Sequence, residues 1–259
     1  MFSAAQFYRL GISNIEKLGI IKYPYLTPSR HNLKTMAEDD STGNDAAPLD
    51  TKVNGTPFSV LLSQAVKLKS AQEAPLRSKF NSFPTFYQNS IFPRDQVDEA
   101  RGKDFEGRME DAGRFKNMGN SALKELRYQD AITCYEMALG VFKYLVNTNP
   151  NWKTEGVKDD YIRQEEFETD VECEKSQVCK FLVMCYTNIA VVSLKTGQLR
   201  QAIEACNEAI EIDSSNVKAL YLRSKARLTP KSAGMVEEDM AVRDLQTAKK
   251  LDPKNQVVM

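Results

Sequence analysis

The segment Phe115–Leu139, FKNMGNSALKELRYQDAITCYEMAL, decides the fold of this chain. The residues that set its pattern are Phe115, Met118 and Gly119 on a first expected helix, and Ala131, Tyr135 and Ala138 on a second. Aromatic residues that alternate with small ones are typical of two helices whose axes lie close together, because the separation depends on the side chains at the contact. The segment therefore predicts a tightly packed antiparallel helix pair.

The same pattern returns twice downstream, as expected of a repeat architecture. The second copy contains Tyr186, Ile189 and Ala190, then Gly197 at the turn, then Ala202, Cys206 and Ala209. The third contains Leu220, then Ala241, Leu245, Ala248 and Pro253, with five extra residues in its turn around Pro230 and Gly234. Twelve residues separate Gly119 from Ala131 and also Ala190 from Ala202, so the first two copies are in register.

These three copies resemble the tetratricopeptide (TPR) family over Arg108–Asn255, a little over half of the chain. The resemblance implies an all-α fold in which three helix pairs form a right-handed superhelical stack. Small residues let the helices approach, and stacking buries faces that one repeat could not bury alone. We assign residues 105–259 to this domain and residues 1–104 to a largely irregular N-terminal arm.

The arm differs from the repeats in its amino-acid composition. Seven prolines precede residue 100, namely Pro24, Pro28, Pro48, Pro57, Pro75, Pro84 and Pro93. Proline clusters favour extended or irregular chain, although 58–69 is compatible with a short amphipathic helix. An aromatic run consists of Phe80, Phe83, Phe86, Tyr87 and Phe92. It either docks onto a second protein partner or, as we favour, packs against the first repeat.

The first 35 residues carry five basic side chains against one acid, which loosely resembles an organelle transit peptide. Alternatively, Met36 is the true start and residues 1–35 are an extension. Without a targeting segment we expect a cytoplasmic protein, and with one a mitochondrial protein.

An acidic expansion, 147–175, separates the first repeat from the second. It ends in a stretch rich in acidic residues, namely Glu165, Glu166, Glu168, Asp170, Glu172 and Glu174. Pro150 should end the preceding helix, and the acids should begin the next one, where negative charge is favourable. A long segment here resembles large immunophilins, whose first repeat has an elongated second helix. The acids either form a solvated face or fold over the basic groove as a competing ligand.

The composition narrows the function classes. Lys plus Arg equals Asp plus Glu at 35 each, so no global field favours nucleic acid or an anionic membrane. We expect no membrane span, since no apolar run reaches the required length. The five cysteines lack CxxC spacing and the single histidine is His31, so we expect no metal and no cofactor. Neither a nucleotide loop nor a nucleophile with a base is evident, and we predict a non-catalytic protein.

Four polar residues recur in register with the repeats, and we call them the quartet: Lys116, Asn120, Asn188 and Lys218. Lys116 and Asn120 are one helical turn apart and share a face. The pattern resembles the carboxylate clamp of co-chaperones, which grips the acidic C-terminal tail of heat-shock chaperones of the seventy- and ninety-kilodalton classes. Lysines suit a terminal carboxylate because charge-assisted hydrogen bonds are strong, and asparagine amides fix its orientation.

One position departs from that family pattern. The resemblance places a second basic residue one turn after Lys218, where this chain has Leu222. Arg223 lies about 140° around the helix from Lys218 and cannot replace it. We expect Leu222 to form an apolar wall for a peptide side chain.

Two hypotheses about function follow. In the first, the protein is a TPR adaptor or co-chaperone that binds a chaperone tail through Lys116, Asn120, Asn188, Lys218 and Leu222. In the second, it is a structural subunit of a larger organellar or ciliary assembly, and the quartet does not bind such a tail.

Overall fold

The computed structural model describes residues 52–53, 56–230 and 234–254. The chain divides into two compact units, residues 1–78 with 150–159, and residues 79–149 with 160–259. Residues 1–51, which include the expected targeting segment and the first part of the proline-rich arm, lie outside the described part of the chain.

The first unit is small in its described part. Strands β1 (Lys52–Val53) and β2 (Thr56–Pro57) pair antiparallel and lead into helix α3 (Phe58–Glu73). A 3-10 turn, η2 (Ala74–Arg77), follows, and the unit also holds the short helix α9 (Trp152–Glu155). The short helix expected over 58–69 is confirmed by α3.

The second unit begins with three short helices, α4 (Ser78–Ser82), α5 (Thr85–Asn89) and α6 (Asp95–Arg101). The expected irregular chain is therefore wrong for most of 70–101. The prolines punctuate these helices rather than prevent them: Pro84, for example, is the N-cap of α5, where its missing N–H costs little. The number of prolines alone therefore led to an overestimate of the irregular structure in this segment.

The aromatic run packs within the chain. Phe80, Phe86 and Tyr87 are at most 3% exposed, whereas Phe92 remains 46% exposed. The Tyr87 hydroxyl bonds to the Tyr186 hydroxyl and donates to Glu208 Oε2 at 2.8 Å. The structure thus shows intramolecular packing of this run. The aromatic residues contact the second repeat as well as the first.

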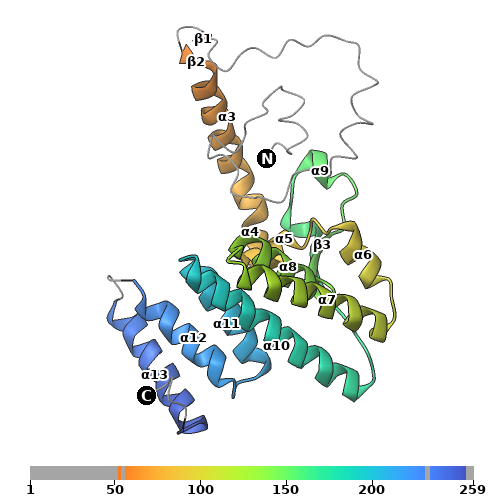
Figure 1. The fold of residues 1–259 in the computed structure, drawn as a ribbon. Helices are drawn as coiled ribbons and strands as arrows, with labels where there is room; N and C mark the ends of the chain where they lie inside the picture. The colour runs from red at the N-terminus through yellow and green to blue at the C-terminus, as the bar shows by residue number, and fades with distance from the viewer. Residues whose placement is uncertain (1–51, 54–55, 231–233, 255–259) are drawn as a thin grey trace. The chain divides into compact units, whose positions relative to one another are not determined.

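Three helix pairs follow one another along the chain (Figure 1). Their bounds are α7 (Phe105–Lys124) with α8 (Tyr128–Gly140), α10 (Glu172–Lys195) with α11 (Leu199–Ile212), and α12 (Val217–Leu228) with α13 (Met235–Leu251). Within each pair the helices pack together, and α8 packs on α10 as α11 packs on α12. The predicted small residues are all fully buried: Ala131, Ala138, Ala190, Ala202, Ala209, Ala241 and Ala248.

A two-stranded antiparallel sheet interrupts the helices between the first and second repeats. Strand β3 (Lys143–Asn147) pairs with β4 (Ile162–Glu166), so the second helix of the first repeat is not elongated. It ends at Gly140, whose carbonyl accepts from Arg101 Nε at 2.8 Å, and Arg108 Nη1 reaches the Val141 carbonyl at 3.4 Å. These arginines satisfy carbonyls that a longer helix would have used.

The acidic residues of the expansion accordingly lie in two different elements. Glu165 and Glu166 lie on β4, whereas Glu172 and Glu174 occupy the first turn of α10, as expected of acids at a helix N-terminus. Glu166 pairs with Lys143 at 3.2 Å. Within the described residues, no ion pair joins these acids to Lys116 or Lys218, so the expansion does not act as a competing ligand in this structure.

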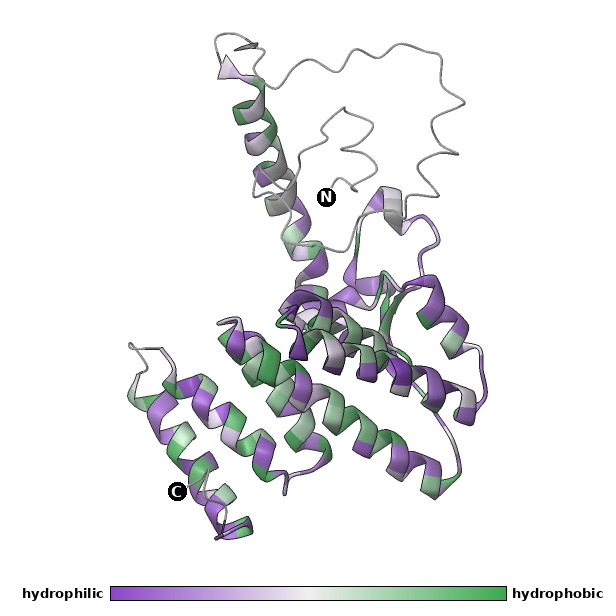
Figure 2. Cartoon of the chain, viewed as in Figure 1, coloured by the Kyte–Doolittle hydropathy of each residue, from purple (hydrophilic) through white to green (hydrophobic). Residues whose placement is uncertain are grey.

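Helix α10 is the central helix of the stack and the most continuously apolar one (Figure 2). By length and hydropathy alone it could cross a membrane, which the sequence inspection had not anticipated. In the structure, however, 61% of its most apolar window is buried and it packs against α7, α8, α11 and α12. Its hydropathy therefore reflects its place in the core.

The turn inside the first repeat contains backbone strain. Leu126 has φ 60° and stands where the second repeat has Gly197, with φ 74°; each lies two residues before its second helix. Both turns end with the same type of hydrogen bond, Arg127 N to Ala122 O and Gln198 N to Ser193 O. A residue with a Cβ is disfavoured in this left-handed region.

We expect Leu126→Gly to stabilise the protein by about 1 kcal/mol, because it removes the strain of the left-handed conformation. The side chain is 67% exposed, so little packing is lost. Chemical denaturation should show the gain, and the matched change Gly197→Ala should show a loss. A destabilised Leu126→Gly variant would contradict this account of the turn.

Glu136 is a buried acid beneath helix α5. It is 9% exposed, Asn89 Nδ2 donates to its Oε2 at 3.0 Å, and its Oε1 has no hydrogen-bond partner in the described part of the chain. Burial raises the pKa of Glu136 from 4.5 to about 8, against the smaller opposing effect of the Asn89 hydrogen bond. The folded protein therefore holds the proton more tightly than the unfolded chain.

Because this folded pKa is raised, the contribution of Glu136 to stability is fully present below pH 4.5 and is lost as pH rises toward 8. We expect Glu136→Gln to stabilise the protein by about 2 kcal/mol at pH 8.5 and to change little at pH 4.5. Unfolding free energies at the two pH values test this, with the exposed Glu211→Gln on α11 as control. An equal effect of Glu136→Gln at both pH values would refute it.

Candidate functional site

The first helices of the three repeats are neighbours. Helix α7 contacts α10, and α10 contacts α12, while the second helices α8 and α11 pack between successive first helices (Figure 1). Side chains on these three helices can therefore meet one ligand although they are far apart in the sequence.

Lys116 and Asn120 project from α7 and are both partly buried. The Lys116 ammonium lies 5.5 Å from the ring centroid of Phe181 on α10, so the side chain crosses from one first helix to the next. The Asn120 Oδ1 accepts a hydrogen bond of 2.8 Å from the Tyr135 hydroxyl. Lys116 thus contacts α10, and Asn120 contacts α8.

Asn188 lies on the side of α10 that α7 faces. It follows Phe181 by seven residues and Cys185 by three, which places the three side chains along one face of the helix. Burial raises the pKa of the Cys185 thiol to about 12, and the charge of nearby Lys116 opposes this. The structure therefore brings Lys116 beside the face of α10 that carries Asn188, whereas the contact of Asn120 is with Tyr135 on α8.

Lys218 is the second residue of α12, and much of its side chain is exposed. Partial desolvation lowers the pKa of Lys218 below its usual range, opposed by the effect of Cys206 on the neighbouring helix α11. Within the described chain no hydrogen bond or ion pair connects Lys218 with the other three members of the quartet. Its part in a shared site stays a prediction.

Leu222 and Arg223 differ sharply in what they contact. Leu222 is 8% exposed, so it offers little surface to a ligand in this structure. Arg223 makes a bidentate pair with Asp244 of α13, at 2.9 and 2.6 Å, and also donates to Asn207. Arg223 is therefore committed to the α12–α13 contact and does not replace the missing basic residue.

The quartet shares one electrostatic property. In the described part of the chain, no carboxylate pairs with Lys116 or Lys218, and no hydrogen-bond acceptor is assigned to the amide groups of Asn120 or Asn188. Six arginines of the described chain, by contrast, are ion-paired, namely Arg101, Arg114, Arg127, Arg200, Arg223 and Arg227. The quartet thus retains donors that an external acceptor can use.

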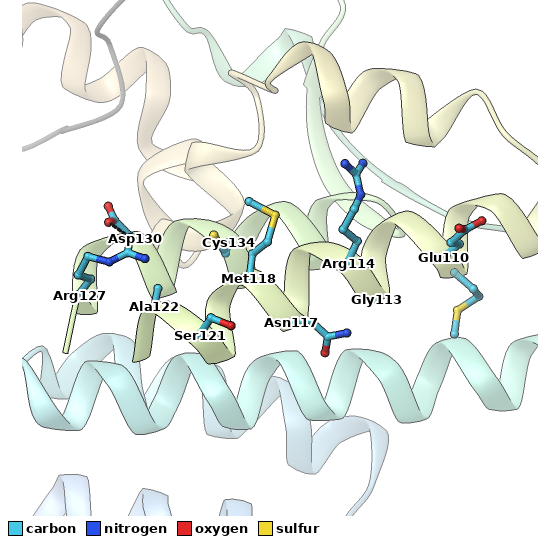
Figure 3. Close-up of a pocket in the computed structure, with 11 residues that line it drawn as sticks. Glu110, Gly113, Arg114, Asn117, Met118, Ser121, Ala122, Arg127, Asp130 and Cys134 are labelled. Atoms are coloured by element: carbon cyan, nitrogen blue, oxygen red, sulfur yellow. Dashed lines mark hydrogen bonds and ion pairs between the residues drawn. The ribbon is translucent and has the colours of Figure 1, made fainter. Parts of the chain in front are cut away.

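A surface hollow that the sequence inspection missed lies on α7 and α8 (Figure 3). It has a volume of about 720 Å³. Its lining residues are Met109, Glu110, Gly113, Arg114, Asn117, Met118, Ser121, Ala122, Arg127, Asp130 and Cys134. Asn117 points toward α10 and Arg114 points to the opposite side of α7 (Figure 3). The small residues Gly113 and Ala122, which leave the space, are the sequence signal for it.

Comparison with known proteins identifies the repeat. Residues 185–216, which include the end of α10 and the whole of α11, match the family model of the tetratricopeptide repeat. This segment is a tetratricopeptide repeat. The expected repeat architecture is therefore confirmed, and the quartet lies on first helices of the TPR pairs.

Curated relatives are isomerases that are much longer than the matching region. The chain is 27% identical to bovine peptidyl-prolyl cis-trans isomerase FKBP4 over 150 residues, 58% of the chain and 27% of the relative. It is 29% identical to Arabidopsis thaliana peptidyl-prolyl cis-trans isomerase PASTICCINO1 over 134 residues, 52% of the chain and 17% of the relative. The chain thus spans at most about a quarter of these relatives' length, and their isomerase activity is not transferred to it.

Solved structures with similarity to the chain are TPR domains. The C-terminal TPR-containing domain of a Plasmodium falciparum FK506-binding protein has a TM-score of 0.46 and 22% identity, and covers 61% of this chain and 88% of that one. The first TPR of Spaghetti (RPAP3), solved with the HSP90 peptide SRMEEVD, has a TM-score of 0.39 and 20% identity, covering 58% of this chain and 86% of that one.

The Arg223–Asp244 pair should be important for the last repeat. Asp244 is 7% exposed at its side chain and also accepts from Arg227 at 2.7 Å. We expect Asp244→Ala to lower the free energy of unfolding by about 3 kcal/mol, because it removes the carboxylate of Arg223 and leaves Arg227 with only the longer contact to Glu237 at 3.6 Å. Denaturant titration measures this, and the exposed Asp239→Ala on the same helix should change little. A near-neutral Asp244→Ala would show that the pair is not stabilising.

Proposed function

We propose that this protein is a non-catalytic TPR adaptor that binds the acidic C-terminal tail of a heat-shock chaperone of the seventy- or ninety-kilodalton class. The tail's carboxylates would contact Lys116, Asn120, Asn188 and Lys218. The observation that carries the proposal is the set of donors on adjacent first helices that no described protein group satisfies.

The charge distribution supports an anionic ligand. The chain as a whole is neutral, and Arg114 of α7 and Arg127 before α8 are paired with acids. Lys116 instead lies over the Phe181 ring, an arrangement that keeps a cation at an apolar surface without neutralising it. A carboxylate that approaches this face would meet an available charge in partly desolvated surroundings, where charge-assisted hydrogen bonds are worth about 1.5–3 kcal/mol.

The residue types favour the end of a polypeptide over an internal acid. A terminal carboxylate and an adjacent aspartate side chain present several acceptor oxygens within a few ångströms, and asparagine amides can donate to them while lysines supply charge. Partial desolvation of Lys218 also lowers its pKa, and an anion nearby would offset that cost by favouring the charged form. Leu222 is buried and uncharged, so the third repeat offers the ligand one basic residue, Lys218, instead of two.

Calorimetric titration with the peptide SRMEEVD, as the free acid and as the C-terminal amide, tests the proposal. The acid should bind in the micromolar range and the amide much more weakly, because the amide lacks the terminal charge. Lys116→Ala should weaken binding of the acid by roughly tenfold or more, from the loss of one charge-assisted contact.

Lys124→Ala is the matched control, since Lys124 is an exposed lysine in the last turn of the same helix. It should bind like the wild type. Equal binding of acid and amide would overturn the proposal and would favour a structural subunit whose quartet binds no such tail.

A further inference from the structure

Tyr135 of α8 connects the helix packing to the quartet. It is fully buried, and its ring lies so close to α7 that a Cβ on Gly119 would be 2.6 Å from Tyr135 Cε1. Such a separation is far inside van der Waals contact, so the ring can occupy this place only because residue 119 is glycine. The hydroxyl at the end of the ring then reaches the next residue of α7, Asn120.

The hydrogen bond between them has a fixed direction. The Tyr135 hydroxyl is 2.8 Å from Asn120 Oδ1, and an amide oxygen can only accept, so the phenol donates. If the amide were reversed, the phenol would accept from the NH₂ group and its own buried proton would lose its acceptor, which costs roughly 1–3 kcal/mol. Burial also raises the pKa of Tyr135 to about 12, so the phenol keeps its proton at neutral pH.

The orientation determines what Asn120 offers to a ligand. With Oδ1 held by Tyr135, the NH₂ group is directed elsewhere, and no described residue accepts a hydrogen bond from it. A side-chain amide that could turn freely would present either a donor or an acceptor. The held amide directs its N–H donors at the ligand; either oxygen of a carboxylate can accept from them, whereas a carboxamide has one accepting oxygen and an NH₂ group that would face these donors.

We propose that Tyr135 is a positioning residue that fixes the amide of Asn120 as a hydrogen-bond donor and so makes the site discriminate a carboxylate from a carboxamide. This inference rests on the proposed function, because it concerns the same ligand. It adds a specificity residue from α8, a helix that contributes no member of the quartet.

The decisive variant is Tyr135→Phe, which keeps the ring and removes the hydroxyl. Its affinity for the free-acid peptide SRMEEVD should fall roughly threefold to tenfold, the effect of one hydrogen bond. Its affinity for the C-terminal amide should stay the same or rise, because a released Asn120 can accept from the ligand's NH₂. An equal loss for acid and amide would show a purely structural role and would overturn the inference.

A double-mutant cycle and a control strengthen the test. In an Asn120→Ala background, Tyr135→Phe should have no further effect on binding of the acid; additive losses would overturn the inference. Tyr87→Phe is the matched control, because it also removes a buried hydroxyl, one that bonds to Tyr186 and Glu208. It should leave the ratio of acid to amide affinity unchanged.

A second readout needs no peptide. The side-chain ¹⁵N order parameter of Asn120, measured by NMR on the full chain, should fall in Tyr135→Phe and not in Tyr87→Phe. An unchanged order parameter in Tyr135→Phe would overturn the positioning role, whatever the binding data show. If the wild type bound acid and amide equally, the proposed function would fail, while the NMR result would still decide whether Tyr135 orders the amide.

Discussion

The close approach of α8 to α7 at Gly119 is the constraint on which the first repeat depends. A side chain at this position would collide with the Tyr135 ring, and the two helices would have to move apart. The same requirement explains the fully buried alanines at the corresponding places of the other pairs, where interiors are packed too densely to accept added volume. The regular spacing of small residues therefore allows the helix pairs to stack. The stacking in turn brings together the helices that carry the quartet.

The cations of the chain differ in whether the chain itself supplies their partners. Arg101 and Arg108 end α8 by binding its carbonyls, and Arg223 and Arg227 hold the last pair through Asp244. Guanidinium groups suit such multidentate contacts because their donors are fixed in a plane. The lysines of the quartet, as flexible point charges without a carboxylate partner in the described chain, are suited to a ligand that arrives from outside.

From residue 79 onward, the segment before the first repeat is part of the packed second unit rather than a free arm. Phe86 and Tyr87 are buried among the helices, with Tyr87 bonded to Tyr186 and Glu208 and its ring near Lys143. The β3–β4 hairpin supplies Lys143 to this network. The chain thus adds local elements to the repeats on surfaces that the repeats would otherwise expose.

The sequence by itself determined the three helix pairs, the buried alanines, the turn at Gly197 and the identity of the quartet, because these follow from a period that depends only on neighbours in the chain. It misjudged residues 70–101 as irregular and expected a longer helix where β3 begins. Those outcomes depend on contacts with distant residues, such as the arginines that cap α8, which no local pattern reveals. The tertiary structure alone decided that Leu222 is buried, that Arg223 belongs to Asp244 and that Tyr135 holds Asn120. Each of these is a matter of which atoms meet across two helices, and spacing along one helix cannot specify the orientation of a side chain on another.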